Sequence, residues 1–168
     1  IILDIETNTT HDKIWCVVTR DIDDGIVREW HEKDSELQRY LSVADKIIMH
    51  NGIFFDAPVL KKVWGITIKK SQVVDTLVLA RLFDPSIEGG HSLEAWGNRL
   101  GHHKAQYKKI WSWMTGITLT KENENLPFDE PIMPLLVWYC KQDTQVTKEL
   151  YKHLTKEMKN DFSKESST

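Results

Sequence analysis

The chain opens with IILDIETNTTHDKIWCVVTRDIDDGIVREW, residues 1–30, where three short apolar runs alternate with polar segments. The runs cover residues 1–6, 14–19 and 26–30, and they are rich in the β-branched and aromatic residues that favour strands. The stretch Asp23-Asp24-Gly25 before the third run is typical of a tight turn. We therefore expect an antiparallel meander of three strands at the start of the chain.

The rest of the chain has one further strand pattern and several helical ones. Residues 46–50 form a short apolar run that stops at Asn51-Gly52. Helical spacing or a helix cap marks five further segments, which are residues 35–44, 54–64, 76–83, 92–100 and 135–158. Residues 116–134 contain three prolines and predict an irregular connection. Strands followed by helices indicate an α/β or α+β fold, with a central mixed β-sheet flanked by helices.

Length and composition indicate one ordinary globular domain. The chain has 168 residues, of which 40% are hydrophobic, and this is enough for a single core. We expect residues 1–160 to form the domain and residues 161–168 to be a frayed polar tail. No apolar run approaches the roughly 20 residues that a membrane-spanning helix needs, so we expect no membrane partner.

The cysteines and the net charge also bear on the class of function. Cys16 and Cys140 are far apart and have no Cys-x-x-Cys spacing, which argues against a disulfide framework or a zinc site and fits a reducing compartment. The formal net charge is −3, so no basic excess indicates a nucleic-acid partner. Any argument for DNA or RNA must therefore come from a local site.

Two acidic residues lie close together on the first apolar run. Residues two apart in a strand point to the same face, so the carboxylates of Asp4 and Glu6 are expected side by side. This arrangement is costly in an apolar strand unless a positive group lies between the two acids, and a divalent cation would remove the cost. The alternative is a strand end that dips into solvent.

Two more segments place acids on helices. Asn51-Gly52-Ile53-Phe54-Phe55-Asp56 follows a strand and puts Asp56 in the first turn of a helix, where the helix dipole favours an acid even without a ligand. Tyr139 and Asp143 are four residues apart and share one helix face. Aspartate has a low helix propensity in mid-helix, so of the four acids Asp143 lies at the position where its expected local structure is least favourable. The alternative is an exposed helix acid.

Together these features resemble a known family. Asp-x-Glu on a first strand, Asn-x-x-x-Phe-Asp after a strand-to-helix turn, and Tyr-x-x-x-Asp on a late helix match the Exo I, Exo II and Exo III motifs of the DEDD superfamily of 3′–5′ exonucleases. The histidine-bearing subgroup would have a histidine where this chain has Trp138, so the resemblance is to the tyrosine-bearing subgroup. The stretches Val74 to Leu82 and Gly89 to Lys108 look like parts of the amino-terminal proofreading domain of T7-type phage DNA polymerases.

The resemblance implies an α/β RNase H-like (DnaQ-like) exonuclease fold and a two-metal site for Mg²⁺ or Mn²⁺. By analogy with the family, Asp4 would bridge both ions. Glu6 and Asp143 would complete the site of the ion that activates water, and Asp56 would act mainly at the other ion. Tyr139 would orient the nucleophilic water, and the product would be a nucleoside 5′-monophosphate.

The same resemblance implies substrate contacts. Backbone or side-chain groups at Ile5, Thr7 and Asn8 would hold the terminal 3′-hydroxyl. Asn51 and Phe55 would contact the terminal nucleotides, Phe55 by stacking on a base. The alternative for Phe55 is packing of a helix face into the core.

The expected substrate is the 3′ end of single-stranded or frayed DNA, in proofreading during phage replication in the cytoplasm of the host. The expected partner is a DNA polymerase domain, fused or separate. Three alternatives stay open at this point. One is a 3′–5′ exoribonuclease similar to RNase D, because the motifs do not read the sugar. Another is a catalytically silent RNase H-like binding module. The last is an RNase H-like endonuclease, which would lack the second and third motifs.

Overall fold

A computed structural model describes residues 1–102 and 106–167 of the chain. Its centre is a five-stranded sheet in the order β3-β2-β1-β4-β5. The strands are β1 (Ile2–Thr7), β2 (Ile14–Arg20), β3 (Val27–Trp30), β4 (Ile47–Met49) and β5 (Val73–Asp75). Strands β1, β2 and β3 form the predicted antiparallel meander, and β4 and β5 continue the sheet in parallel with β1. The mixed sheet confirms the predicted α/β class.

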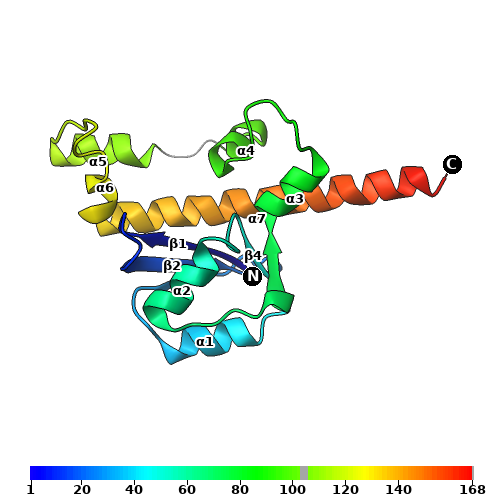
Figure 1. Cartoon of the computed structure of the whole chain (residues 1–168), viewed down its shortest axis with the longest axis horizontal. Helices are drawn as coiled ribbons and strands as arrows, with labels where there is room; N and C mark the ends of the chain where they lie inside the picture. The colour runs from blue at the N-terminus through cyan, green and yellow to red at the C-terminus, as the bar shows by residue number, and fades with distance from the viewer. Residues whose placement is uncertain (103–105, 168) are drawn as a thin grey trace.

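Helices cover both faces of this sheet. They are α1 (Ser35–Ser42), α2 (Asp56–Trp64), the single 3₁₀ turn η1 (Lys70–Gln72), α3 (Thr76–Phe83), α4 (Leu93–Arg99), α5 (Tyr107–Thr115), α6 (Leu126–Asp129) and α7 (Met133–Glu165). Figure 1 shows α1 and α2 on one side of the sheet and the long α7 running along the other side. The end of α7 extends beyond the sheet and past α3 (Figure 1).

Successive side chains of the central strand β1 point to opposite faces of the sheet, so its apolar residues and its acids lie on different faces. Leu3 and Ile5 of β1 point into the main apolar cluster, where they pack with residues of α1 and α2 such as Leu37 and Leu60. Asp4 and Glu6 therefore point to the opposite face, toward α7. The central position of β1 and its neighbours on both sides hold these two acids in place.

Several predicted helix ends are confirmed by their caps. The side chain of Asp34 accepts the backbone N–H of Glu36 at the start of α1, and Ser92 does the same for Ala95 in α4. Helix α2 ends at Gly65, whose backbone has a φ of +66°, a left-handed conformation that favours glycine.

The structure differs from the sequence-based prediction in two regions. The helix predicted to end near residue 158 continues to Glu165, so residues 161–165 prolong α7 and do not form the frayed tail that we expected. This segment has no proline or glycine to end the helix, and it is exposed throughout. Strand β5 and helices α5 and α6 were not predicted; α6 is a short helix within the irregular connection expected at residues 116–134.

None of the described helices combines the length and the apolar character needed to cross a bilayer. Residues 103–105, within the stretch Gly89 to Lys108 that resembles phage polymerases, and residue 168 lie outside the described residues.

Candidate active site

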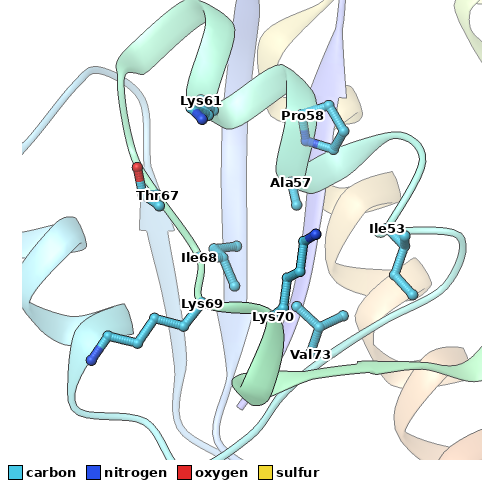
Figure 2. A pocket seen from close by; sticks show the side chains of 9 residues that line it. All are labelled: Ile53, Ala57, Pro58, Lys61, Thr67, Ile68, Lys69, Lys70 and Val73. Atoms are coloured by element: carbon cyan, nitrogen blue, oxygen red, sulfur yellow. The ribbon is translucent and has the colours of Figure 1, made fainter.

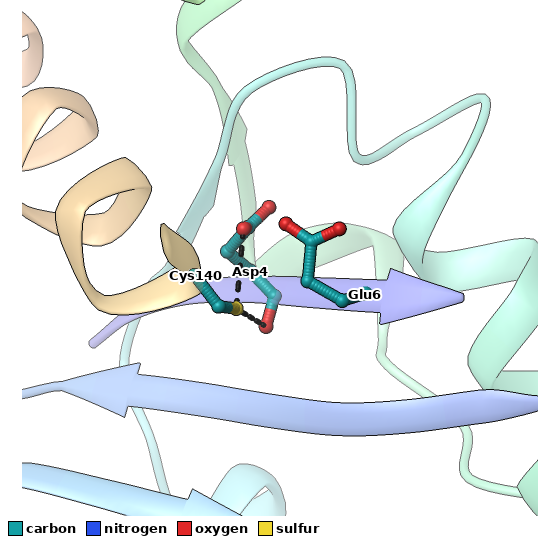
Figure 3. A group of neighbouring side chains, drawn as sticks. All are labelled: Asp4, Glu6 and Cys140. Carbon is teal, nitrogen blue, oxygen red and sulfur yellow. Dashed lines mark hydrogen bonds between the residues drawn. The ribbon is translucent and has the colours of Figure 1, made fainter. Parts of the chain in front are cut away.

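The acids of β1 lie beside a cysteine of α7. Figure 3 shows Asp4 and Glu6 projecting from the same face of β1, with Cys140 against Asp4. The Cys140 thiol donates to Asp4 Oδ2 over 3.3 Å, and one ligand atom from each of the three residues lies within 4.8 Å of the others. Burial raises the pKa of this thiol, so it stays protonated and acts as a donor. Glu6 is only 8% exposed, which excludes for its side chain a strand end that dips into solvent.

Asp56 enters the same site from the start of α2. Its side chain is 3% exposed and lies within hydrogen-bonding reach of the backbone of Ile5, between the two acids of β1. Burial, and then repulsion by Asp75 and Asp143, raise the pKa of Asp56 to about 8 against the lowering effect of its backbone hydrogen bonds. Among the described residues, no group forms a hydrogen bond to its buried Oδ2 atom.

Helix α7 supplies the remaining acid. Asp143 is 6% exposed and close enough to Asp56 to raise the pKa of that residue, so the alternative of an exposed helix acid is excluded. Cys140, one turn earlier on α7, contacts Asp4. The four acids predicted from the motifs therefore come together at one place, from β1, α2 and α7.

Tyr139 lies at the edge of this acidic group, in an aromatic cluster that also contains Tyr107 of α5. It is half-buried, and its ring centroid is 5.2 Å from that of Tyr107. The Tyr107 hydroxyl donates to the carbonyl of Pro127, and its ring lies 5.2 Å from that of Phe128. Burial, and next the charge of Glu6, raise the pKa of Tyr107, which places the aromatic cluster beside the acids. Tyr107 is thus a neighbour of the site that the motifs did not indicate.

The residues expected to contact substrate fall into two groups. The side chains of Ile5 and Thr7 are buried, and the side chain of Asn8 closes the following loop by accepting the N–H groups of Asp12 and Lys13, each over 3.1 Å. The backbone at these positions remains the part that could meet a terminal 3′-hydroxyl.

Asn51 and Phe55 lie on the turn that precedes α2. Asn51 is half-buried and has a φ of +62°. Phe55 is half-buried, packs against the main apolar cluster and meets the ring of His11 edge-on at 4.9 Å. Packing therefore occupies part of the Phe55 ring and leaves part of it accessible.

Asp75 has a larger role than the helix cap predicted for it. The cap is confirmed, because its carboxylate accepts the N–H of Leu77 over 2.9 Å. The same carboxylate also accepts the N–H groups of Asn51 and Ile53, over 2.9 and 3.2 Å. It therefore fixes the turn that positions Asp56. No local sequence pattern predicts these hydrogen bonds, because they join segments that are distant in sequence.

Gly52 tightens this turn further. A Cβ atom added there would lie 2.4 Å from Cβ of Met49, so only glycine fits. The second motif is thus held by the close contact of Gly52 with the side chain of Met49 and by the carboxylate of Asp75.

Comparison with known proteins bears on this arrangement. The DNA polymerase of Enterobacteria phage T3 is 29% identical to the chain in an alignment of 191 positions, which covers 92% of this chain and 26% of that polymerase. The chain is similar in sequence to phage DNA polymerases. The polymerase of Escherichia phage T7 is 28% identical to the chain in an alignment of 188 positions, which again covers 92% of this chain and 26% of that polymerase. The resemblance to T7-type phage DNA polymerases is confirmed, and the chain spans about a quarter of the length of these relatives. No protein-family model matches the chain.

Solved structures share the fold. A nuclease in its apo form superposes with a TM-score of 0.61 at 19% identity, over 95% of this chain and 73% of the other. The family B DNA polymerase of the archaeon Pyrobaculum calidifontis gives a TM-score of 0.61 at 16% identity, over 92% of this chain and 24% of that polymerase. With the strand order of the mixed sheet, these matches confirm the RNase H-like fold.

Proposed function

We propose that the chain is a 3′–5′ exonuclease of the proofreading type, which hydrolyses single-stranded or frayed DNA from its 3′ end. The observation that supports this most is the convergence of Asp4, Glu6, Asp56 and Asp143, with Tyr139 beside them. Similarity to phage DNA polymerases favours DNA over RNA as the substrate.

The donor set fits two divalent cations. Oδ2 of Asp56 is buried with no hydrogen-bond partner among the described residues, and the acids around it repel its charged form. Hard cations such as Mg²⁺ and Mn²⁺ prefer carboxylate oxygens and would remove this repulsion. We propose that Asp4 is shared by both cations, that Glu6 and Asp143 complete one site, and that Asp56 serves the other. When bound, the cations supply charge that stabilises the attacking and leaving oxygens of a phosphodiester.

The side chains around the acids have positioning roles in this proposal. The Tyr139 hydroxyl orients the attacking water, and the ring of Tyr107 limits the movement of Tyr139. The Cys140 thiol fixes the carboxylate of Asp4 through its hydrogen bond. A bond forms between the water oxygen and phosphorus, and the bond between phosphorus and the 3′-oxygen of the penultimate nucleotide breaks. The water loses a proton, and the leaving 3′-oxygen gains one. The products are a nucleoside 5′-monophosphate and a strand shortened by one nucleotide.

The terminal nucleotide is held by the first two motifs in this proposal. The backbone of Ile5 and Thr7, together with Asn8, meets the 3′-hydroxyl. Asn51 contacts the terminal nucleotides, and the accessible part of the Phe55 ring stacks on a base. Asp75 acts through the turn that it fixes.

The relatives also suggest the working context. Because they are DNA polymerases and the chain spans about a quarter of their length, we propose that residues 1–160 form an exonuclease domain that works with a polymerase, fused or separate. The cytoplasm of an infected bacterium is the corresponding location.

Incubation of the chain with 5′-labelled single-stranded DNA or RNA of the same sequence tests the proposal, with Mg²⁺, Mn²⁺ or EDTA. A ladder that shortens from the 3′ end on DNA, requires metal and disappears in Asp143→Ala is the expected result. Asp161→Ala, an exposed aspartate of the same helix, is the matched control and should behave as wild type. Preference for RNA would identify an exoribonuclease instead, and a folded, metal-loaded chain that degrades neither strand would contradict the enzyme proposal.

A further inference from the structure

A hollow of about 770 Å³ lies beside the second motif, between helix α2 and the segment that leads into β5. Figure 2 shows the side chains that line it. They are Ile53, Ala57, Pro58, Lys61, Thr67, Ile68, Lys69, Lys70 and Val73. We call this hollow the α2 pocket.

The α2 pocket adjoins the turn that carries the second motif. Ile53 belongs to the turn fixed by Asp75, and Ala57 directly follows Asp56 on α2. Ile68 and Val73 complete an apolar surface across from α2 (Figure 2). Apolar side chains also pack against the faces of nucleobases.

Three lysines surround this apolar surface. Lys61, Lys69 and Lys70 are exposed, and in the part of the chain that the structure describes none of them has an ion-pair partner. The ammonium group of Lys70 points across the hollow toward α2, whereas Lys69 points outward (Figure 2). The lining contains no acidic residue, although acids outnumber Lys and Arg in the chain by 25 to 22. The α2 pocket is therefore a local positive region on an acidic protein.

We infer that the α2 pocket binds the substrate strand upstream of its 3′ end, with bases against the apolar wall and phosphates near the three lysines. The inference rests on the proposed exonuclease function, and it adds a second contact region to the catalytic site. Lysine contacts to phosphates release counterions, so they give affinity that falls with salt and does not depend on sequence. A strand long enough to reach the pocket would gain this affinity, and a short strand would not.

A nucleic-acid strand accounts for the pocket better than an acidic peptide does. In the proposed function the second motif holds the 3′ end of the strand, so a pocket beside that motif is within reach of the upstream nucleotides. The apolar wall and the neighbouring lysines together match a base and its phosphate. An acidic peptide would also pair with the lysines, but the proposed function brings no peptide to the second motif.

The test compares KM and kcat for 5′-labelled DNA strands of about 16 and about 4 nucleotides, which span the usual range of single-strand site sizes. Wild type is compared with the triple variant Lys61→Gln, Lys69→Gln, Lys70→Gln at several salt concentrations in Mg²⁺. The matched control is Lys152→Gln, Lys156→Gln, Lys159→Gln, which removes the same charge from exposed positions of α7 outside the pocket lining.

We expect the pocket variant to raise KM for the long strand several-fold, with kcat and all constants for the short strand unchanged. The slope of log KM against log salt should decrease by about 0.7 for each phosphate that no longer pairs with a lysine. The control should match wild type. The inference would be overturned if the pocket variant had an unchanged KM for the long strand, or if its KM rose equally for both strands. It would also be overturned if a polyglutamate peptide displaced the long strand from wild type while the pocket variant kept the KM of wild type. Failure of wild type to cut the short strand would instead refute the proposed exonuclease function.

Discussion

At the scale of single residues, the candidate site brings several acidic side chains together in a largely buried place. Asp56 shows the effect most clearly, because burial and two neighbouring acids raise its pKa to about 8. A site of this kind is unfavourable for the protein alone and becomes favourable when cations arrive. The acids of the three motifs are therefore expected to affect stability and activity in opposite directions.

The pH dependence of stability follows from this shift. The pKa of Asp56 is about 8 in the folded chain and near 3.8 in an ordinary carboxyl group, so the folded state holds a proton that the unfolded state releases. The stabilising contribution is complete below the ordinary pKa and is lost as the pH rises through the folded value. In EDTA, the Tm of wild type should fall between these two pH values, and the Tm of Asp56→Asn should fall less. Parallel Tm curves for the two proteins would contradict this account.

Asp75 allows a test of positioning without touching the proposed ligands. Asp75→Ala removes the acceptor of three backbone N–H groups and should lower the free energy of unfolding by about 2–4 kcal/mol. It should also lower kcat/KM, because Asp56 and Asn51 lose their fixed turn. Asp34→Ala removes a helix cap far from the site and should cost about 1 kcal/mol with activity unchanged. Urea unfolding and the nuclease assay measure both quantities, and full activity of Asp75→Ala would refute the positioning role.

The substitution Tyr139→Phe removes the hydroxyl and keeps the aromatic ring. The ring still packs against Tyr107, so Tm should stay unchanged, while kcat should fall about 10²-fold through loss of the group that orients water. Steady-state kinetics with single-stranded DNA measure this effect. Tyr151→Phe, on a half-buried tyrosine of the same helix, should retain wild-type kcat. A Tyr139→Phe enzyme with wild-type kcat would exclude the hydroxyl from the mechanism.

At the scale of elements, α7 connects the site to the rest of the molecule. Its buried residues run from Leu136 to Leu154, and residues 161–167 are all exposed. The part of α7 that carries Tyr139 and Asp143 is thus packed against the sheet, and the last turns are not.

Removal of residues 161–168 tests the boundary proposed for the domain. The truncated chain loses no buried side chain among the described residues, so its free energy of unfolding should change by less than about 0.5 kcal/mol. Nuclease activity should also remain. Leu150→Ala, which opens a cavity in the packed part of α7, should cost about 2–5 kcal/mol in the same urea titration. A large loss of stability on truncation would move the domain boundary beyond residue 160.

Much of this element structure could be predicted from local patterns. The three strands of the meander follow from their β-branched runs, and α1, α3 and α4 follow from their cap residues. Strand β5 has only Val73 and Val74 before Asp75, the cap residue of α3, so its apolar run is too short to indicate a strand, and it exists through its pairing with β4. Helix α5 begins after a stretch of mixed polar residues with no side-chain cap, and its packing of Tyr107 and Trp111 stabilises it.

The site was predictable to the extent that its residues follow motif spacing. Asp4 and Glu6 share a face by strand geometry, and Tyr139 and Asp143 share one by helix geometry. Asp75, Tyr107 and Cys140 act through contacts with segments distant in sequence. Such contacts exist only in the folded chain, so no local pattern could indicate them.

At the scale of the whole molecule, the net charge of −3 is compatible with a nucleic-acid substrate because charge is distributed by region. Bound cations would provide the attraction for the scissile phosphate, and the α2 pocket would provide it for the upstream strand. The acidic surface elsewhere then limits unspecific binding to DNA.

Metal binding should accordingly stabilise the entire fold. With Mg²⁺ at about 100 times its Kd, the free energy of unfolding should increase by about 2.7 kcal/mol for one site. Asp4→Asn should abolish most of this gain, whereas the exposed control Asp161→Asn should keep it. Thermal unfolding with and without Mg²⁺ measures the gain. An equal gain in both variants would indicate that the metal acts elsewhere.

The central claim is that four carboxylates from β1, α2 and α7 form a single site for two cations. Titration of the chain with Mn²⁺ in the presence of a nucleoside 5′-monophosphate, followed by electron paramagnetic resonance of the free ion, tests it most directly. The account predicts two Mn²⁺ bound per chain in wild type and a clear loss of both in Asp4→Asn. Absence of binding in wild type, or unchanged binding in Asp4→Asn, would contradict it.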